Sequence, residues 1–105
     1  MHPHQLKPQE LAEPYKEILT RLRLRPGVNM LRAPETAKKA GLGISTLWRD
    51  VKAGTFVPPV RLGPRTVAWI EAEVDAVLEA KTKMSRSHQD FDIRNFVNEI
   101  IRSQR

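Results

Sequence analysis

The sequence predicts one mainly α-helical domain with a small β-hairpin, and three observations support this prediction. The chain has 105 residues, which is enough for one small domain with short extensions. Apolar residues recur at helical spacing in several separate segments. Proline and glycine interrupt these segments and are densest at residues 58–64, where a tight turn between short strands fits best.

The first expected element is a helix of about three turns at residues 14–24. Its apolar face consists of Leu11, Tyr15, Ile18, Leu19 and Leu22. Pro14 suits the first turn of this helix, and Pro26-Gly27 ends it. Residues 1–8 are polar and contain two prolines, so we expect a disordered tail. Residues 1–30 should therefore form an N-terminal tail and helix.

Two short helices are expected next, at residues 34–40 and 45–53. Pro34 suits the first position of the earlier helix. Each helix is followed by a glycine, which can adopt the left-handed conformation common at helix ends. The N-cap of the second helix is either Gly43 or Ser45, of which glycine is the weaker choice. The two helices are thus joined by a tight turn.

A hairpin follows the second of these helices. Short strands near residues 60–62 and 66–68 can pair around the turn Gly63-Pro64-Arg65. A third helix is expected at residues 71–83. Two helices joined by a turn and followed by a hairpin have the order of a winged helix-turn-helix. We therefore expect residues 31–83 to form such a domain.

The C-terminal part is expected to be a linker at residues 84–90 and an amphipathic helix within residues 91–105. Asp92 can cap this helix. Its apolar stripe is formed by Ile93, Phe96, Val97, Ile100 and Ile101. The stripe can pack against the first helix of the same chain or against a neighbouring subunit. We favour self-association, because a large apolar stripe on a small protein often marks an interface.

Positive charge is concentrated in the middle of the chain. Lysine and arginine outnumber aspartate and glutamate by 18 to 12, a formal net charge of +6. Residues 31–69 hold seven basic and two acidic residues, so this segment alone carries +5. Such an excess favours a polyanionic partner such as DNA. Net charge alone is equally consistent with a soluble basic domain that binds no polyanion.

The second helix of a helix-turn-helix enters the major groove of DNA with its N-terminal residues near the base edges. Ser45 and Thr46 begin this helix, where hydroxyl groups and free backbone N–H groups can bind a phosphate. Arg49 is the best candidate for reading a base, since a guanidinium can bond guanine O6 and N7 together. Lys52 is expected on a phosphate. Trp48 belongs either to the interface or to the core.

The expected hairpin supplies further candidates. Arg61 and Arg65 lie at its turn and can enter a narrow minor groove, or they are only surface charges. Lys38 and Lys39 of the preceding helix can contact the DNA backbone or simply face solvent. Trp69 ends the second strand and should be buried as an anchor for the third helix.

The sequence favours neither an enzyme nor a metal protein. The chain has no cysteine, and His2, His4 and His88 have no carboxylates at ligand spacing nearby. A Gly-rich phosphate loop is also missing from the sequence. We expect no cofactor, no small-molecule substrate and no membrane-spanning helix, because no apolar run approaches the necessary length. A bacterial cytoplasmic, nucleoid-associated protein is the resulting expectation.

Residues 31–81 resemble the AlpA-type phage regulators and the related excisionases, which have MerR-like winged helix-turn-helix domains. The matching segments are Gly41-Leu42, Ser45-Thr46-Leu47-Trp48-Arg49, Lys52-Ala53-Gly54-Thr55-Phe56, Pro59-Val60-Arg61-Leu62-Gly63-Pro64-Arg65, Val67-Ala68-Trp69 and the acidic helix after them. Gly43 and Ile44 depart from the usual serine and basic residue, which removes one cap and one phosphate contact. Ile70 replaces a polar residue, and the extensions at both ends lie outside the resemblance.

The resemblance implies a sequence-specific double-stranded DNA-binding protein of a prophage or integrative mobile element. Such proteins regulate transcription, or act as excisionases, that is, recombination directionality factors working with an integrase at an attachment site. Self-association on DNA would suit the second role. The alternatives are a transcription regulator only, or a protein-interaction adaptor that uses the C-terminal helix and has no salt-sensitive DNA affinity.

Overall fold

A computed structural model describes residues 11–24, 28–87 and 92–103. Within these ranges the chain is mainly helical, with a small three-stranded antiparallel sheet, as expected. The helices are α1 Glu13–Arg23, α2 Ala33–Ala40, α3 Ile44–Ala53, α4 Glu71–Ser87 and α5 Ile93–Ser103. The strands are β1 Met30–Leu31, β2 Val60–Gly63 and β3 Thr66–Ile70.

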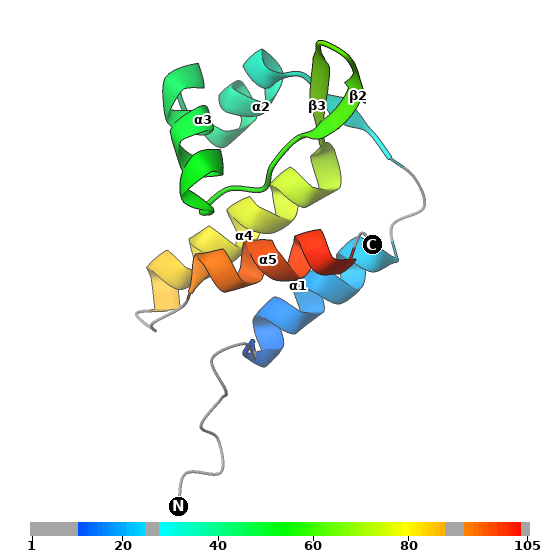
Figure 1. Ribbon diagram of the computed structural model, residues 1–105. Helices are drawn as coiled ribbons and strands as arrows, with labels where there is room; N and C mark the ends of the chain where they lie inside the picture. Colours follow the sequence, from blue (N-terminus) through cyan, green and yellow to red (C-terminus); the bar gives the residue numbers. More distant parts are fainter. Residues whose placement is uncertain (1–10, 25–27, 88–91, 104–105) are drawn as a thin grey trace, which may run out of the picture.

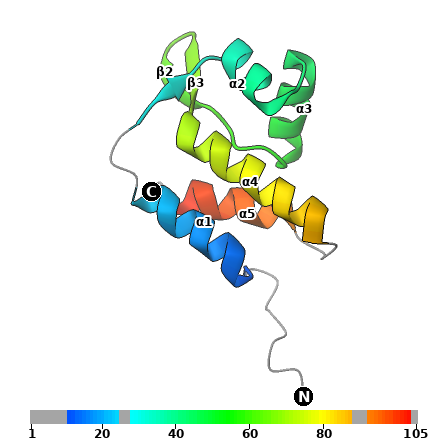
Figure 2. The same ribbon diagram turned by 180° about the vertical axis from the view of Figure 1, so that it is seen from behind.

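Helix α4 separates two parts of the molecule (Figure 1). Helices α2 and α3 and the β2–β3 hairpin lie on one side of α4, and α1 and α5 lie on the other (Figure 2). Helix α4 contacts α1, α2, α5 and β3. The helix-turn-helix and its hairpin therefore rest on a base made by α4, α1 and α5.

Strand β1 is an element that the sequence did not predict. It pairs with the end of β3, with Met30 opposite Ile70 and Leu31 opposite Trp69. On its other edge β3 pairs with β2, so the sheet order is β1-β3-β2. A two-residue strand is too short to show an alternating pattern. It exists because β3 continues to Ile70 and offers a free edge.

Helix α4 is longer than expected, and this corrects the position of the linker. Residues 84–87, assigned to the linker from their polarity, form the last turn of α4. No glycine or proline occurs between residues 71 and 87, so nothing in the local sequence ends the helix. The remainder of the expected linker and the expected tail at residues 1–8 lie outside the described residues, as does Pro26-Gly27.

The expected helix ends are largely confirmed. Gly41 and Gly54 follow α2 and α3 with φ of 70° and 80°, which only glycine adopts readily. The N-cap of α3 is Gly43, the weaker of the two candidates, and no side chain caps the helix. In α5 the Asp92 carboxylate accepts backbone N–H bonds from Arg94 at 3.0 Å and Asn95 at 3.3 Å.

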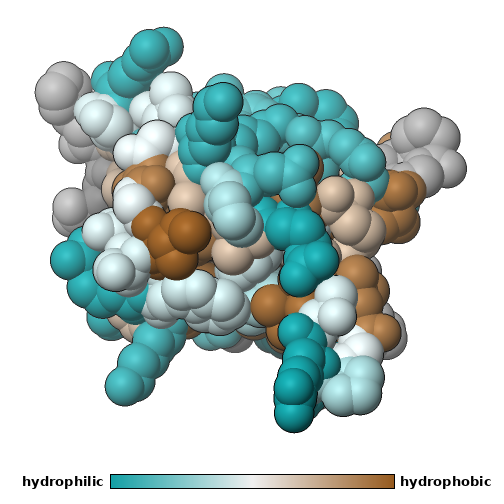
Figure 3. Space-filling model, turned by 90° about the horizontal axis from the view of Figure 1, so that it is seen from above, coloured by the Kyte–Doolittle hydropathy of each residue, from teal (hydrophilic) through white to brown (hydrophobic). Residues whose placement is uncertain are grey.

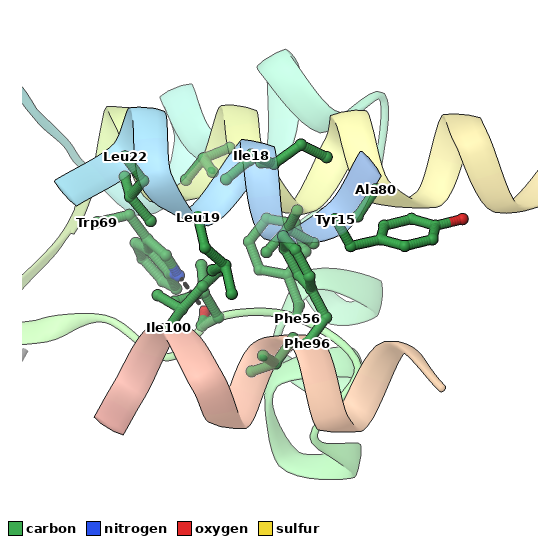
Figure 4. Packing of buried hydrophobic residues seen from close by; sticks show 14 of the residues in the cluster. Tyr15, Ile18, Leu19, Leu22, Phe56, Trp69, Ala80, Phe96 and Ile100 are labelled. Atoms are coloured by element: carbon green, nitrogen blue, oxygen red, sulfur yellow. Dashed lines mark hydrogen bonds between the residues drawn. The ribbon is translucent and has the colours of Figure 1, made fainter. Parts of the chain in front are cut away.

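Trp69 is fully buried, as predicted for an anchor. Its indole Nε1 donates a hydrogen bond of 2.9 Å to the Val57 carbonyl. This bond fixes the segment between α3 and β2 against the end of β3 (Figure 4). Phe56, just before that carbonyl, is buried as well. The segment that connects α3 to the hairpin is thus anchored in the core by two buried aromatic side chains.

The apolar stripe of α5 packs inside its own chain. Phe96, Val97 and Ile100 are buried, and Ile93 and Ile101 are partly buried against the same core. Residues Tyr15, Ile18, Leu19 and Leu22 of α1 belong to that core (Figure 4). The rings of Tyr15 and Phe96 meet edge to face, with centroids 6.2 Å apart. Within this chain α1 already covers the stripe, which favours the intramolecular alternative, and self-association through these residues stays a prediction.

Candidate nucleic-acid interface

Helix α3 lies at the outer end of the molecule, opposite α1 and α5 (Figure 1). Leu47 is fully buried and Val51 packs against the core, so these two residues define its inner face. Ser45, Arg49 and Lys52 are exposed on the opposite face. The sequence predicted this division from the four-residue spacing of the two apolar side chains. The cationic residues of α3 are thus available to a partner.

Arg49 is highly accessible on α3. Its side chain is 74% exposed, and its Nε lies 3.6 Å from Oδ1 of Asp50. That distance is too long for a hydrogen bond, so this pair holds the guanidinium only weakly. The fork of N–H donors can therefore turn toward a base edge with little loss of an existing interaction.

The first turn of α3 is open at its N-terminal end. Gly43 has no side chain to cap it, and Ser45 is exposed while Thr46 is half-buried. The early N–H groups of a helix have no partner within the helix and carry partial positive charge. A phosphate oxygen is one group that could satisfy them.

Trp48 is intermediate between the two positions considered for it. The residue is 41% exposed, and its ring meets the buried ring of Trp69 edge to face. The ring centroids are 5.2 Å apart and the ring planes are inclined by 60°. The contact with Trp69 holds Trp48 in place, while the rest of its indole stays open to solvent.

The two arginines of the hairpin differ in their surroundings. Arg61 donates from Nε to the Gly63 carbonyl at 3.3 Å and from an Nη to the Pro64 carbonyl at 3.0 Å. Arg61 therefore stabilises its own turn, although the sequence suggested that its side chain could reach toward DNA. Arg65 is exposed within that turn. Arg65 is the better candidate for a contact from the hairpin.

Lys39 has a different role from the one considered for it. Its ammonium lies 2.8 Å from a carboxylate oxygen of Glu71 and 2.9 Å from one of Asp75. These contacts raise the pKa of Lys39. The pKa of Glu71 is lowered by its hydrogen bond from Lys39 and by a second one from Asn29. Lys39 thus ties α2 to α4, while Lys38 remains exposed.

Arg94 is a residue that the sequence reasoning missed. Its Nε donates a hydrogen bond of 3.1 Å to the carbonyl of Ala53, the last residue of α3. Its side chain also lies 3.8 Å from the position that a Cβ on Gly54 would occupy. A cation at a helix C-terminus satisfies a free carbonyl and opposes the helix dipole. No local pattern links two residues that are 41 positions apart.

Lys81 of α4 also supports the segment that follows α3. Its ammonium lies 5.4 Å from the centroid of the Phe56 ring, within the range of a cation–π contact. Burial lowers the pKa of Lys81, although the charge of Asp50 opposes that shift. The partly buried ammonium of Lys81 therefore stabilises the fold, whereas the cationic side chains of α3 are exposed and available to a partner.

The described residues contain no group of three or more histidine, aspartate or glutamate side chains arranged like metal ligands. His2, His4 and His88 lie outside the described part of the chain. None of the described helices combines the length and apolar character required to cross a membrane.

The fold and the exposed cations of α3 define a small, basic winged helix-turn-helix protein. The model of the family described as prophage CP4-57 regulatory protein (AlpA) matches residues 29–82. The chain therefore belongs to the AlpA family of phage-type regulators. The match begins after α1 and ends within α4, so α1, the last turn of α4 and α5 lie outside it.

Two relatives support this assignment. The DNA-binding transcriptional activator AlpA of Escherichia coli K12 is 35% identical over 66 residues, which cover 57% of this chain and 94% of the relative. The uncharacterized protein ORF88 of Enterobacteria phage P4 is 44% identical over 46 residues, or 44% of this chain. The chain spans 52% of the length of that phage protein. No solved structure matches the chain.

Proposed function

We propose that this protein is a sequence-specific double-stranded DNA-binding regulator of a prophage or integrative mobile element. The observation that carries the proposal is the exposed cationic face of α3, which projects from a helix-turn-helix in a family of phage-type regulators. A related protein is described as a DNA-binding transcriptional activator. In a bacterial cell such a protein acts in the cytoplasm, at the nucleoid.

Each group in the proposed interface has one role. Arg49 reads a base edge from the major groove, and Lys52 neutralises a phosphate. Ser45, Thr46 and the first N–H groups of α3 hold another phosphate. Arg65 follows the neighbouring groove, with Arg61 fixing the turn and Lys38 near the backbone. Trp48 supports α3 through Trp69.

Two biological roles are compatible with this interface. The protein either activates or represses genes of its element, or acts as an excisionase, a recombination directionality factor that assists an integrase. Because α1 covers most of the α5 stripe, self-association on DNA would more readily use another surface of the protein. The alternative of a protein-interaction adaptor that uses the C-terminal helix would need the exposed side of α5, because its apolar stripe packs in the core.

A footprint on the promoters and attachment region of the host element tests the proposal. Protection of a defined duplex segment, lost with Arg49→Ala, supports DNA recognition by α3. Equal affinity for every duplex at low ionic strength would leave only non-specific binding, and a lack of any binding would remove the proposal.

An excision assay with the cognate integrase separates the two roles. Excision that requires this protein supports a directionality factor. Excision that proceeds equally without it, together with changed transcription from a bound promoter, supports a regulator alone.

A further inference from the structure

Two large apolar side chains are exposed together on α3. Ile44 is 46% exposed and Trp48 is 41% exposed. They lie four residues apart in one helix, so they are neighbours on the same side of it. The other exposed large apolar residues of the described chain, Leu24, Val28 and Leu62, belong to other segments. In the view onto this end, isolated apolar patches interrupt a hydrophilic surface (Figure 3).

Ile44 is not part of the packing that supports α3, and Trp48 takes part in it only through its contact with Trp69. Leu47 and Val51 supply the inner face of the helix. The ring of Trp48 contacts the buried ring of Trp69 edge to face, which positions its indole on this side of the helix. Ile44 follows Gly43, and even a Cβ built on Gly43 would meet no atom within 4 Å. The first turn therefore presents the isoleucine to any approaching surface.

The charges on the same helix identify the kind of surface. Arg49 and Lys52 are exposed beside the apolar pair, so the ligand carries negative charge as well as an apolar group. The major groove of DNA fits both requirements. Its only exposed apolar group is the C5 methyl of thymine, which small apolar side chains contact directly. Residues at the start of a recognition helix are those that reach base edges.

We propose that Ile44, held in register by Trp48, contacts the C5 methyl group of one thymine in the target site. The inference rests on the proposed DNA-binding function and adds a ligand group to it. Since 5-methylcytosine carries a methyl group at the same ring position, Ile44 also tolerates that base better than unmodified cytosine. Arg49 then supplies hydrogen-bond readout and Ile44 supplies apolar readout from a single helix.

The test uses the tightest-binding duplex that the protein itself selects from a random-sequence library. Each thymine is replaced in turn by deoxyuridine, which removes only the methyl group. Wild-type protein should lose affinity about fourfold at one position, which is the effect of one buried methyl-sized group. Ile44→Ser should bind the thymine and deoxyuridine duplexes equally at that position. Ile44→Val, which keeps a branched apolar side chain, should retain the discrimination.

Leu24→Ala is the control, because it removes another exposed large apolar side chain, at the C-terminal cap of α1 and away from α3. It should leave the discrimination intact. Loss of the discrimination in Leu62→Ala but not in Ile44→Ser would assign the methyl group to the hairpin and overturn the inference. Selection of a defined duplex with no position sensitive to deoxyuridine would overturn it too, yet leave DNA recognition standing. Failure to select any duplex would remove both proposals.

Discussion

Arg49 is the residue on which sequence recognition should depend most. We expect Arg49→Ala to cost about 1–3 kcal/mol in binding the cognate site and to relax specificity at one base position. In the free protein the guanidinium makes only a weak 3.6 Å contact with Asp50. Its removal therefore changes little within the protein, and the loss of affinity reports the contact with DNA. Binding titrations against the cognate duplex and single-base variants measure the effect.

Arg102→Ala is the control for this substitution. Arg102 is an exposed arginine of α5 that bonds Glu99 at 3.0 Å, at the opposite part of the molecule. Arg102→Ala removes the same charge as Arg49→Ala but from a surface away from α3. The substitution should therefore leave specificity unchanged at every base position. If Arg49→Ala and Arg102→Ala weaken binding equally, α3 is not the recognition helix.

Glu71 should make folding stability depend on acid pH. Its pKa is lowered in the folded state, first by the hydrogen bond from Lys39 and then by that from Asn29. A carboxyl group with a lowered folded-state pKa stabilises the fold above its unfolded-state pKa, and this stabilisation disappears as the pH falls through the folded-state value. Glu71→Gln should therefore lower stability at neutral pH and flatten its acid dependence.

Urea denaturation at a series of pH values measures this prediction. The exposed pair is screened by water and salt, so the effect should be modest and should shrink at high ionic strength. Glu13→Gln is the matched control on α1, because the Glu13 carboxylate is mostly exposed and lies in a loose 3.8 Å pair with the Lys16 ammonium. An acid dependence of Glu71→Gln identical to that of wild type would contradict the prediction.

At the scale of elements, α5 is connected to the recognition helix through Arg94. Its bond to the Ala53 carbonyl and its contact beside Gly54 hold the end of α3. We expect Arg94→Ala to lower the free energy of unfolding by about 1 kcal/mol, the usual net value of one hydrogen bond. Thermal or urea unfolding measures this value, and Arg102→Ala on the exposed side of α5 should cost less.

The apolar face of α5 should matter far more for stability than for association. Phe96→Ala is expected to cost about 3–5 kcal/mol, because the ring is buried against Tyr15 in the shared core. Urea unfolding of the free protein tests this. Unchanged stability combined with loss of an oligomer in sedimentation would instead restore the self-association interpretation of the stripe.

The expected elements show which parts of the fold are local. The periodic stripes of α1 and α5, the glycine ends of α2 and α3 and the Asp92 cap each depend on a few neighbouring residues. Strand β1 and the last turn of α4 were missed for a physical reason. Strand β1 forms only because it can pair with the edge of β3, which is distant in the sequence. Helix α4 continues through its last turn because no glycine or proline ends it earlier.

For the molecule as a whole, duplex binding should be strongly salt-dependent. If four to seven phosphates are contacted, the logarithm of the binding constant should fall against that of salt concentration with a slope of roughly −4 to −6. The charge of residues 31–69 supports contacts in this range. Affinity measured across a salt series gives the slope. A slope near zero would mean that phosphates contribute little and would contradict DNA binding by this surface.

The part of the candidate site that lies on α3 could be predicted from the sequence. Spacing alone assigned Leu47 and Val51 to the core and Arg49 and Lys52 to the surface, and the structure agrees. Spacing could not show that Lys39 forms ion pairs with Glu71 and Asp75, since those carboxylates come from another helix. Nor could it show that Arg61 bonds back to its own turn.

The amino-acid sequence by itself determined the order of helices and hairpin, the charged segment and the family resemblance, because each arises from residues close together in the chain. The tertiary structure decided where the long-range partners meet. It covered the α5 stripe with α1, placed Arg94 at the end of α3 and left Ile44 exposed at its beginning. An apolar stripe looks the same in sequence whether its partner is the same chain or another one. Only the packed arrangement shows which side chains remain free to bind.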